Sequence, residues 1–257
     1  MIRVENACVS FGGLKAVDDV SFDIPTGQIT GLIGPNGAGK TTLFNAIAGH
    51  VPLVSGRIYL GDRDITRLPP HARASLGLAR TFQIPHEFTR LTVLENLLAA
   101  AEMPLGENIF NVVFRKGLYL QEEKAAFDAA WELIDFLEIA PVAQEQAGNL
   151  SGGQKKLLEL GRALIRNPKI VLLDEIGAGI NRTLLAKIAE KILLLNRERG
   201  LTFCLIEHDF GHVRSLCSEA IVLVQGQLLT RGNVEKVESD ERVVEAYFGG
   251  GKYEAAL

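Results

Sequence analysis

The segment GLIGPNGAGKTTLFNAIAG, residues 31–49, constrains the fold of this 257-residue chain more than any other stretch. An apolar run at 28–33 leads into its glycines, and a helix is expected from about residue 40. A strand, a glycine-rich loop ending in Lys-Thr and a helix, in that order, form the context of a phosphate-binding loop. The backbone N–H groups of the loop and the positive end of the helix both attract phosphate. The sequence therefore predicts a P-loop NTPase core.

Each residue type in this loop has a physical role toward phosphate. The glycines allow positive φ angles and let the backbone approach the phosphates without a clash from a Cβ atom. Lys40 is expected to neutralise the β- and γ-phosphates, and the Thr41 hydroxyl to ligate Mg²⁺. The alternative, a glycine-rich turn with a solvated lysine, leaves the flanking strand and helix unexplained. The candidate phosphate-binding residues are Gly34, Pro35, Asn36, Gly37, Ala38, Gly39, Lys40, Thr41 and Thr42.

Short apolar segments alternate with helical ones, which predicts an α/β fold around a mostly parallel sheet. The runs at 28–33, 169–173 and 201–206 are nearly all apolar, as strands buried on both faces should be. Residues 219–230 are typical of an antiparallel hairpin that turns at Gln225-Gly226. The candidate strands are 2–8, 20–24, 28–33, 56–60, 78–82, 169–173, 201–206 and 219–224.

The middle of the chain has a different pattern, because helical periodicity dominates from about 85 to 165 and strand signals are absent. Thr92 and Glu95 form a capping box that opens one helix, and 121–138 is a second candidate helix. We expect a single domain, 1–257, in which an inserted helical subdomain interrupts an α/β core. The core is expected at 1–84 and 161–257, and the helical subdomain at 85–160.

Polar side chains follow two of the apolar strands, where α/β folds place their ligands. In IVLLDE, Asp174 is placed to bind Mg²⁺ directly or through water, and Glu175 to act as a general base. A strand ending in Asp-Glu is by itself more often a solvated turn, but the phosphate loop favours the functional interpretation. His208, in LIEHDF, is expected to contact the γ-phosphate. Gln83, in ARTFQ, is a weaker candidate for touching Mg²⁺ or the attacking water.

The segment LSGGQKK at 150–156 places a second capped helix start far along the chain from the phosphate loop. Ser151 is a good N-cap, and two glycines after it would let a phosphate approach the exposed N–H groups. The following helix has an apolar face that anchors it on the core. Its N-terminus could complete a nucleotide site on another copy of the chain; the alternative is a capped helix with a flexible start. The candidate residues are Ser151, Gly152, Gly153 and Gln154.

Composition excludes several classes of protein. The formal net charge is −4, so no basic field points to nucleic acid as the main partner. Cys8, Cys204 and Cys217 lack metal-ligand spacing and are expected to be free thiols in a reducing compartment. The chain shows neither a signal-peptide pattern nor an apolar run of the ~20 residues that cross a bilayer. We therefore expect a soluble chain that docks onto a membrane protein.

The motifs Walker A, TFQ, LSGGQ, LLDE and EHD, in this order, resemble the ATP-binding subunit of an ABC transporter. The resemblance covers essentially the whole chain, and LSGGQ is highly specific for that superfamily. It implies an ABC ATPase cassette: a P-loop NTPase core with a mostly parallel sheet, an antiparallel β subdomain and the inserted helical subdomain. It also implies head-to-tail pairing, in which ATP lies between the Walker A loop of one subunit and the LSGGQ helix of the other.

The resemblance gives several residues a role by position. Phe11 is similar to the aromatic residue that stacks on adenine, and Val17 would flank it. Gln83 resembles the Q-loop glutamine, Glu175 the catalytic base that follows Asp174, and AGIN at 178–181 the D-loop. A guanine-reading NKxD motif is missing, so ATP with Mg²⁺ is the expected ligand. The candidate catalytic residues are Glu175, His208 and Gln83, and the candidate metal ligands are Thr41, Gln83 and Asp174.

Finer features resemble the high-affinity branched-chain amino acid importers, a pattern that urea and amide importers share. These features are ARTFQ, a long insertion at 103–120, AGIN and the ending VVEAYFGG. The resemblance implies two permease subunits, a second paralogous ATPase subunit or a homodimer, and a periplasmic or extracellular solute-binding protein. It places the chain peripherally on the cytoplasmic face of the inner membrane. The lipopolysaccharide-export ATPase is similar too, but we do not expect it to carry this insertion.

Two functions of other classes remain as alternatives. A non-transport ABC ATPase acting on DNA or ribosomes usually carries two cassettes or a long coiled-coil or zinc-hook insertion, which this chain lacks. A P-loop kinase for small molecules does not explain the LSGGQ segment. One departure from the family also stands out, because Ile176 occupies the position where most relatives have proline. We expect the hydrolytic residues to work despite it, and an Ile176→Pro change to alter the ATPase rate modestly.

Overall fold

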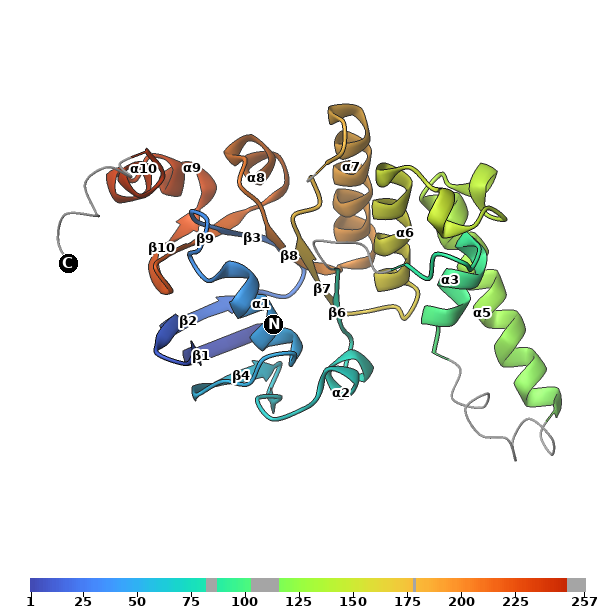
Figure 1. Cartoon of the computed structure of the whole chain (residues 1–257), viewed down its shortest axis with the longest axis horizontal. Helices are drawn as coiled ribbons and strands as arrows, with labels where there is room; N and C mark the ends of the chain where they lie inside the picture. The colour runs from blue at the N-terminus through green and yellow to red at the C-terminus, as the bar shows by residue number, and fades with distance from the viewer. Residues whose placement is uncertain (82–86, 103–115, 178, 249–257) are drawn as a thin grey trace. The chain divides into compact units, whose positions relative to one another are not determined.

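The computed structural model describes residues 1–81, 87–102, 116–177 and 179–248. The chain divides into two compact units. The first contains residues 1–80, 169–178 and 189–257, and the second contains 81–168 and 179–188. The described strands belong to the first unit, and the second unit is mainly helical (Figure 1). The domain boundaries expected at 84/85 and 160/161 stay a prediction.

A six-stranded sheet organises the first unit, with the strand order β10-β9-β3-β8-β7-β6. All its strands run parallel except β10, which pairs antiparallel with β9. Every residue of β3, β7 and β8 is buried, which explains why their sequences are nearly all apolar. The strands are β3 (Ile29–Ile33), β6 (Leu78–Arg80), β7 (Ile170–Asp174), β8 (Thr202–Ile206), β9 (Glu219–Val224) and β10 (Gln227–Asn233).

The predicted hairpin at 219–230 is confirmed. The first residue pair of the hairpin is Val224 in β9 and Gln227 in β10, so the turn between the strands consists of Gln225 and Gly226. Both turn residues have positive φ angles, 48° and 80°, which suit the right-handed twist of the paired strands. A Cβ at Gly226 would lie 3.0 Å from the carbonyl oxygen of Ala16. Glycine is therefore required here both by the turn and by a neighbouring backbone.

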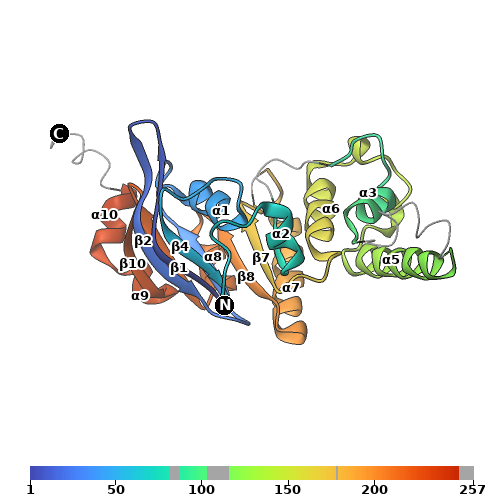
Figure 2. The same ribbon diagram turned by 90° about the horizontal axis from the view of Figure 1, so that it is seen from below.

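A second sheet of the first unit is antiparallel, with the order β2-β1-β4-β5. Its strands are β1 (Ile2–Phe11), β2 (Leu14–Ile24), β4 (Ser55–Leu60) and β5 (Arg63–Asp64). β1, β2 and β4 run side by side in Figure 2. The sequence predicted β2 only for 20–24 and missed β5. The first half of β2 was not predicted because Leu14, Lys15, Asp18 and Asp19 break the apolar alternation that marks a half-buried strand.

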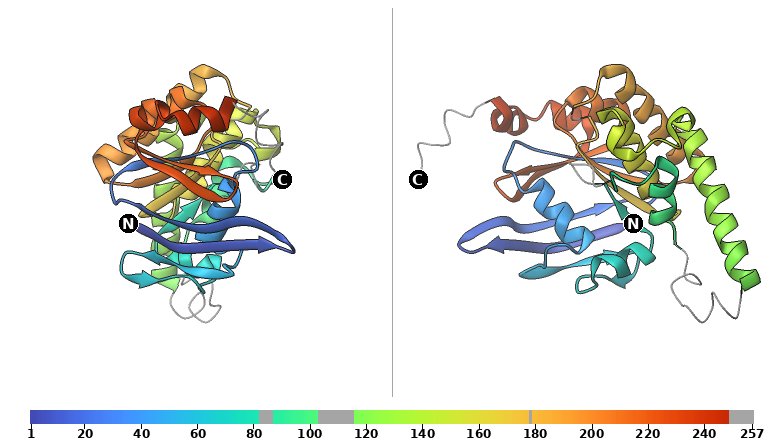
Figure 3. Two further views of the ribbon diagram at one scale, coloured as in Figure 1. Left: turned by 90° about the vertical axis from the view of Figure 1, so that its left-hand side faces the viewer. Right: turned by 45° about the vertical axis from the view of Figure 1, so that its right-hand side comes forward.

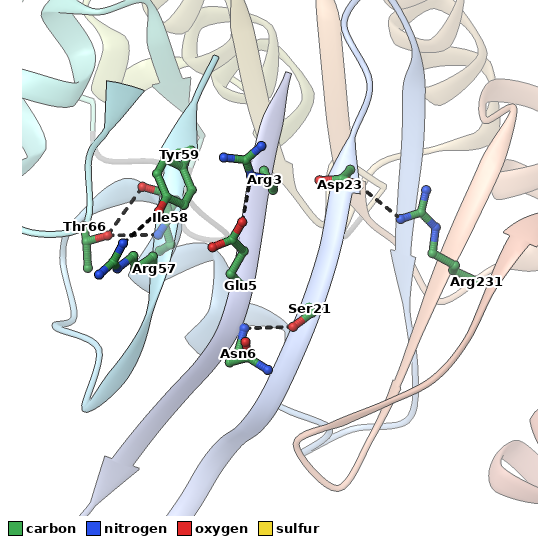
Figure 4. A network of polar contacts seen from close by, with 10 residues as sticks. All are labelled: Arg3, Glu5, Asn6, Ser21, Asp23, Arg57, Ile58, Tyr59, Thr66 and Arg231. Atoms are coloured by element: carbon green, nitrogen blue, oxygen red, sulfur yellow. Dashed lines mark hydrogen bonds and ion pairs between the residues drawn. The ribbon is translucent and has the colours of Figure 1, made fainter. Parts of the chain in front are cut away.

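One face of this antiparallel sheet carries polar contacts (Figure 4). Arg3 pairs with Glu5 at 3.0 Å and lies 4.4 Å over the ring of Tyr59. The backbone N–H of Asn6 donates to Ser21 Oγ at 2.7 Å. Exposed pairs of this kind contribute little free energy, typically about 0–1 kcal/mol. The sheet is held mainly by its backbone pairing and by its apolar face.

That apolar face packs into a core shared with helix α1 (Lys40–Ala48), the helix that follows the phosphate loop. Leu43, Phe44 and Ile47 of α1 are fully buried in the cluster, together with residues of both sheets. Figure 3 shows α1 between the two sheets. Because α1 is anchored on both sides, its N-terminus has a fixed position at the end of β3.

The other helices of the first unit are short, apart from α7 (Arg182–Arg199), which starts in the second unit and ends in the first. α2 ends next to β6, and α8 follows β8. The aromatic rings of Phe210 in α8 and Tyr247 in α10 pack against each other, with centroids 5.3 Å apart. The short helices are α2 (Pro70–Ser75), α8 (Phe210–Leu216), α9 (Val234–Glu238) and α10 (Glu241–Phe248).

The second unit contains α3 (Val93–Ala100), α5 (Lys116–Phe136) and α6 (Gly152–Leu164), with short 3₁₀ turns at Ala140–Val142 and Ala147–Asn149. The predicted capping box is confirmed, because Thr92 accepts from the N–H of Glu95 and the Glu95 carboxylate accepts from the N–H of Thr92. The helix predicted at 121–138 is present with different bounds, because α5 spans Lys116–Phe136. No helix among the described residues is both long and apolar enough to span a membrane.

Candidate nucleotide-binding and catalytic site

The phosphate loop connects β3 to α1, as predicted. Gly34, Gly37 and Gly39 have φ angles of 149°, 79° and 94°. A Cβ at Gly34 would lie 2.1 Å from the carbonyl oxygen of Leu223, and one at Gly39 would lie 2.3 Å from that of Ala16. Any side chain at these two positions would therefore force the backbone apart. Glycine is required by packing against β9 and β2 in addition to the approach of phosphate.

Lys40 begins α1 and is only 6% exposed. Its ammonium donates to the carbonyl oxygens of Gly34 at 2.7 Å and Pro35 at 2.9 Å, so it curls back over the loop. Burial lowers the pKa of Lys40, and the carboxylates of Glu175 and Asp174 raise it. The lysine charge and these two carboxylates thus share one small region at the ends of β3 and β7.

The remaining loop residues line the start of α1. Ala38 is buried; its backbone N–H donates to the carbonyl oxygen of Pro35, and its carbonyl oxygen accepts from the N–H of Gly226, which fixes the shape of the loop. Asn36 and Thr41 are exposed, and Thr42 is half-buried. An exposed hydroxyl in the first turn of α1 suits the role that the sequence predicts for Thr41.

Asp174 is the last residue of β7 and is 1% exposed. Its Oδ2 lies 3.0 Å from Nη2 of Arg80, the last residue of β6. The two strands are parallel neighbours, so their carboxyl ends meet at one edge of the sheet. Asp174 is therefore a buried carboxylate in a buried ion pair, beside the phosphate loop.

Glu175 and His208 meet at the same edge. The Nε2 of His208 lies 2.6 Å from Oε1 of Glu175, and β7 and β8, which precede these residues, are adjacent parallel strands. Glu175 has a φ of 49°, in the left-handed region that non-glycine residues seldom adopt. Asp209 caps α8 by accepting from the N–H of Gly211 at 2.7 Å, and this helix start fixes the backbone after His208.

The two residues expected around an adenine base have different environments. Phe11 ends β1 and is 53% exposed, so its ring can take a ligand. Val17 is fully buried in the core cluster. The structure therefore does not bring an open face of Val17 to the ligand side, and its contact with a base stays a prediction.

The LSGGQ segment forms the capped helix start that the sequence predicts. Ser151 caps α6 by accepting from the N–H of Gln154 at 3.3 Å, and Gln154 Oε1 accepts from the N–H of Ser151 at 2.9 Å. A Cβ at Gly152 would meet nothing within 4 Å, whereas one at Gly153 would lie 2.0 Å from Leu184 Cδ2. Gly152 thus leaves the helix start open, as predicted, while Gly153 also has a packing reason that the sequence did not reveal.

Two of the predicted functional segments reach residues that the structure does not describe. Gln83 lies within 82–86, and Ala178, the first residue of the AGIN segment, is a single gap. The other candidates fall into two groups. Those from the phosphate loop, β7 and β8 belong to the first unit, and Ser151 to Gln154 belong to the second.

A profile of the family described as ABC transporter matches residues 17–178 of this sequence, from β2 to the segment after β7. The chain belongs to the ABC transporter family. It is 39% identical, over 97% of both chains, to the probable branched-chain amino acid transport ATP-binding protein LivG of Methanocaldococcus jannaschii. It is 34% identical to the high-affinity branched-chain amino acid transport ATP-binding protein LivG of Escherichia coli, over 97% of this chain and 98% of the relative.

Solved structures of ABC transporter cassettes share this fold. A nucleotide-free ATP-binding cassette from an ABC transporter is 39% identical and superposes with a TM-score of 0.84, covering 97% of this chain and 99% of the other. The ADP conformation of an ATP-binding cassette superposes with a TM-score of 0.83, again at 39% identity, and covers 97% and 98% of the two chains. The predicted α/β cassette, with a mostly parallel sheet, an antiparallel sheet and a helical part, is confirmed.

The cassette's residues suit a magnesium nucleotide better than a metal held by protein alone. Mg²⁺ takes few protein ligands and completes its shell with phosphate and water. Within the described residues, no group of three or more His, Cys, Asp and Glu side chains could hold a metal ion. One buried carboxylate, Asp174, and one exposed hydroxyl, Thr41, flank the lysine of the phosphate loop. This donor set fits Mg²⁺ only if a nucleotide brings phosphate oxygens.

Sequence reasoning missed two polar residues of this cassette. Arg80 lies in the ARTFQ segment. A carboxylate at the end of a buried strand needs a cation beside it, and a search for that cation would have pointed to Arg80. Glu207 precedes His208 and is 5% exposed. Its Oε1 has no hydrogen-bond partner, and the backbone N–H groups of Gly177 and His208 lie beside the carboxylate. No local signal distinguishes Glu207 from an exposed glutamate.

Proposed function

We propose that the chain is the ATP-hydrolysing subunit of an ABC importer for branched-chain or other neutral amino acids. The observation that carries the hydrolytic part is the 2.6 Å contact between Glu175 and His208 at the strand ends beside the phosphate loop. A carboxylate held there by a histidine can act as a base toward water, and the buried Lys40 is placed to meet the phosphate that the water attacks.

In this proposal the loop N–H groups and Lys40 bind the β- and γ-phosphates. Thr41 and Asp174 would hold Mg²⁺, with Gln83 as a further candidate, and the bound ion would supply positive charge beside the phosphate oxygens. Glu175 takes up the proton of the attacking water. His208 orients Glu175 and, when ATP is bound, donates toward the γ-phosphate.

The signature helix supplies the second half of the site in trans. The capped start of α6 leaves N–H groups exposed at Gly152, and a helix N-terminus of this kind favours an anion. We propose that Ser151 to Gln154 of a second ATPase subunit cover the γ-phosphate bound to this one. The second subunit is a paralogue or another copy of this chain.

The proposed cargo and location follow from the relatives. Two of them, named above, are branched-chain amino acid transport proteins and match over nearly the whole chain. The proposed partners are two permease subunits and, indirectly, an external solute-binding protein, with the cassette on the cytoplasmic face of the membrane. A urea or amide importer, lipopolysaccharide export and a non-transport ABC ATPase are the competing assignments.

Two experiments test the proposal. Glu175→Gln should lower the ATPase rate by about 10²–10⁴-fold while ATP binding persists and an ATP-bound dimer accumulates on gel filtration. Glu198→Gln, an exposed change on α7, is the matched control and should hydrolyse normally. A wild-type rate for Glu175→Gln would refute the base assignment.

Affinity purification from native membranes should recover two amino-acid-type permeases and a second ATPase. Recovery of lipopolysaccharide-export proteins or ribosomes would refute the assignment as an amino acid importer.

A further inference from the structure

Arg80 makes polar contacts with two other elements of the first unit. From the end of β6, its Nη2 lies 3.0 Å from Asp174 Oδ2 at the end of β7. Its Nη1 donates to Asn45 Oδ1, on the helix that follows the phosphate loop. One guanidinium thus connects the strand that carries Asp174 to the helix that carries Lys40 and Thr41.

This contact is unlike the surface ion pairs of the chain. The side chains of Arg80 and Asp174 are 6% and 1% exposed, whereas those of Arg166 and Glu102, which lie 2.8 Å apart, are 33% and 51% exposed. A carboxylate buried to this degree is strongly unfavourable without a positive partner.

The contact also limits what Asp174 can do. Arg80 holds one oxygen of the carboxylate in a fixed direction and neutralises its charge. A divalent cation that approaches the same carboxylate meets the field of the guanidinium, because like charges repel more strongly where water is scarce. Arg80 therefore stabilises the chain before magnesium nucleotide binds, and opposes the ion as it arrives.

We propose that Arg80 is a positioning residue that acts as the internal counter-ion of Asp174 and sets the Mg²⁺ concentration at which nucleotide binds. This inference rests on the proposed function, because it takes Asp174 as the residue that faces the magnesium ion. It assigns the arginine of the ARTFQ segment a part in metal dependence, separate from hydrolysis itself.

The test is a Mg²⁺ titration of the binding of a fluorescent ATP analogue to the full-length chain, read by fluorescence and not by hydrolysis. Arg80→Met should lower the half-maximal Mg²⁺ concentration about tenfold, which corresponds to about 1.4 kcal/mol. Arg80→Lys retains a positive charge and should keep the wild-type midpoint. Arg67→Met is the control, because it removes an exposed arginine of the same unit and should keep the wild-type midpoint.

The outcomes separate this inference from the proposed function. A wild-type midpoint for Arg80→Met would overturn the inference while the nucleotide site stands. Nucleotide binding by the wild-type chain that does not respond to Mg²⁺ would also overturn the inference, whereas a wild-type chain that binds no nucleotide at all would overturn the proposed function. If Arg80→Met does not fold, a double-mutant cycle of Arg80→Gln and Asp174→Asn, read by urea unfolding without nucleotide, decides. Non-additive losses support the counter-ion, and additive losses refute it.

Discussion

Nη1 of Arg73 donates to the carbonyl oxygen of Ala46 at 2.7 Å, in the last turn of the helix that follows the phosphate loop. The same nitrogen reaches Ile47 at 2.6 Å, and Nε and Nη2 bind the carbonyl oxygens of Leu68 and Thr66, both at 2.9 Å. Carbonyl groups at a helix C-terminus lack partners within the helix and carry negative partial charge. A single buried arginine therefore fixes the far end of the helix whose near end meets phosphate.

Replacing Arg73 should destabilise the first unit. Arg73→Met removes the guanidinium donor from all four carbonyl groups, although Ala46 still accepts from the N–H of Gly49. We expect the free energy of unfolding to fall by about 3 kcal/mol. Urea unfolding followed by circular dichroism measures this loss. Arg67→Met removes an exposed arginine from the same region and should change the free energy by no more than about 0.5 kcal/mol. Equal effects of the two changes would contradict the role given to Arg73.

Glu207 predicts a pH dependence of stability. Burial, above all, raises the pKa of its carboxyl group to about 7 from an ordinary 4.5, against the effect of the N–H groups of Gly177 and His208. The charges of Glu175 and Asp209 face it and raise the pKa further. The folded chain thus holds the proton more tightly than the unfolded chain does. Stability from this group is complete below pH 4.5 and is lost as the pH rises to about 7.

Glu207→Gln should remove that loss. The variant should gain stability over the wild type at pH 8 and show a smaller gain, or none, at pH 5. The full difference is at most about 3–4 kcal/mol, because each pKa unit corresponds to about 1.36 kcal/mol. Urea midpoints at the two pH values provide the measurement. Glu198→Gln, an exposed control on α7, should shift both midpoints equally; the same behaviour from Glu207→Gln would show that its carboxyl group is not perturbed.

The glycine pair of the signature segment makes a third prediction. Gly153→Ala would place a Cβ 2.0 Å from Leu184 Cδ2, while Gly152→Ala meets open space. We expect Gly153→Ala to lower the unfolding free energy by about 1–3 kcal/mol, as overpacking does, and Gly152→Ala to change it little. Adding Leu184→Ala to Gly153→Ala should recover part of the loss. If both glycine variants are equally stable, the packing role of Gly153 is wrong.

The residues that sequence reasoning found are those whose chemistry is local. The phosphate loop, the capping box at Thr92 and the capped start of α6 depend on residues within a few positions of one another. Their spacing carries the signal. Glu175 and His208 were each found because they follow an apolar strand. That they touch depends on β7 and β8 being neighbours in the sheet, which strand patterns alone do not decide.

The residues that sequence reasoning missed act over long distances in sequence. Arg80 and Asp174 are 94 positions apart, and Arg73 lies 27 positions from Ala46. An arginine in a short helix or at a strand end is ordinarily exposed, so nothing local predicts its burial. Val17, which the family resemblance places beside a base, is buried, and its contact with a base stays a prediction.

The position after Glu175, the proposed general base, gives the last prediction. Glu175 has a φ of 49°, and Ile176 is 7% exposed. A proline pushes the preceding residue toward extended conformations, so Ile176→Pro would oppose the backbone that brings Glu175 to His208. We expect the ATPase rate to fall, but by less than about tenfold, or about 1.4 kcal/mol. Steady-state phosphate release measures it.

Ile176→Val is the control for this change, because it keeps a buried apolar side chain without constraining Glu175. Its ATPase rate should match that of the wild type. If the valine variant loses as much activity as the proline variant, packing of Ile176 is responsible and the backbone argument fails. If the proline variant alone loses well over tenfold in ATPase rate, the left-handed conformation of Glu175 is required for hydrolysis and is not merely favourable.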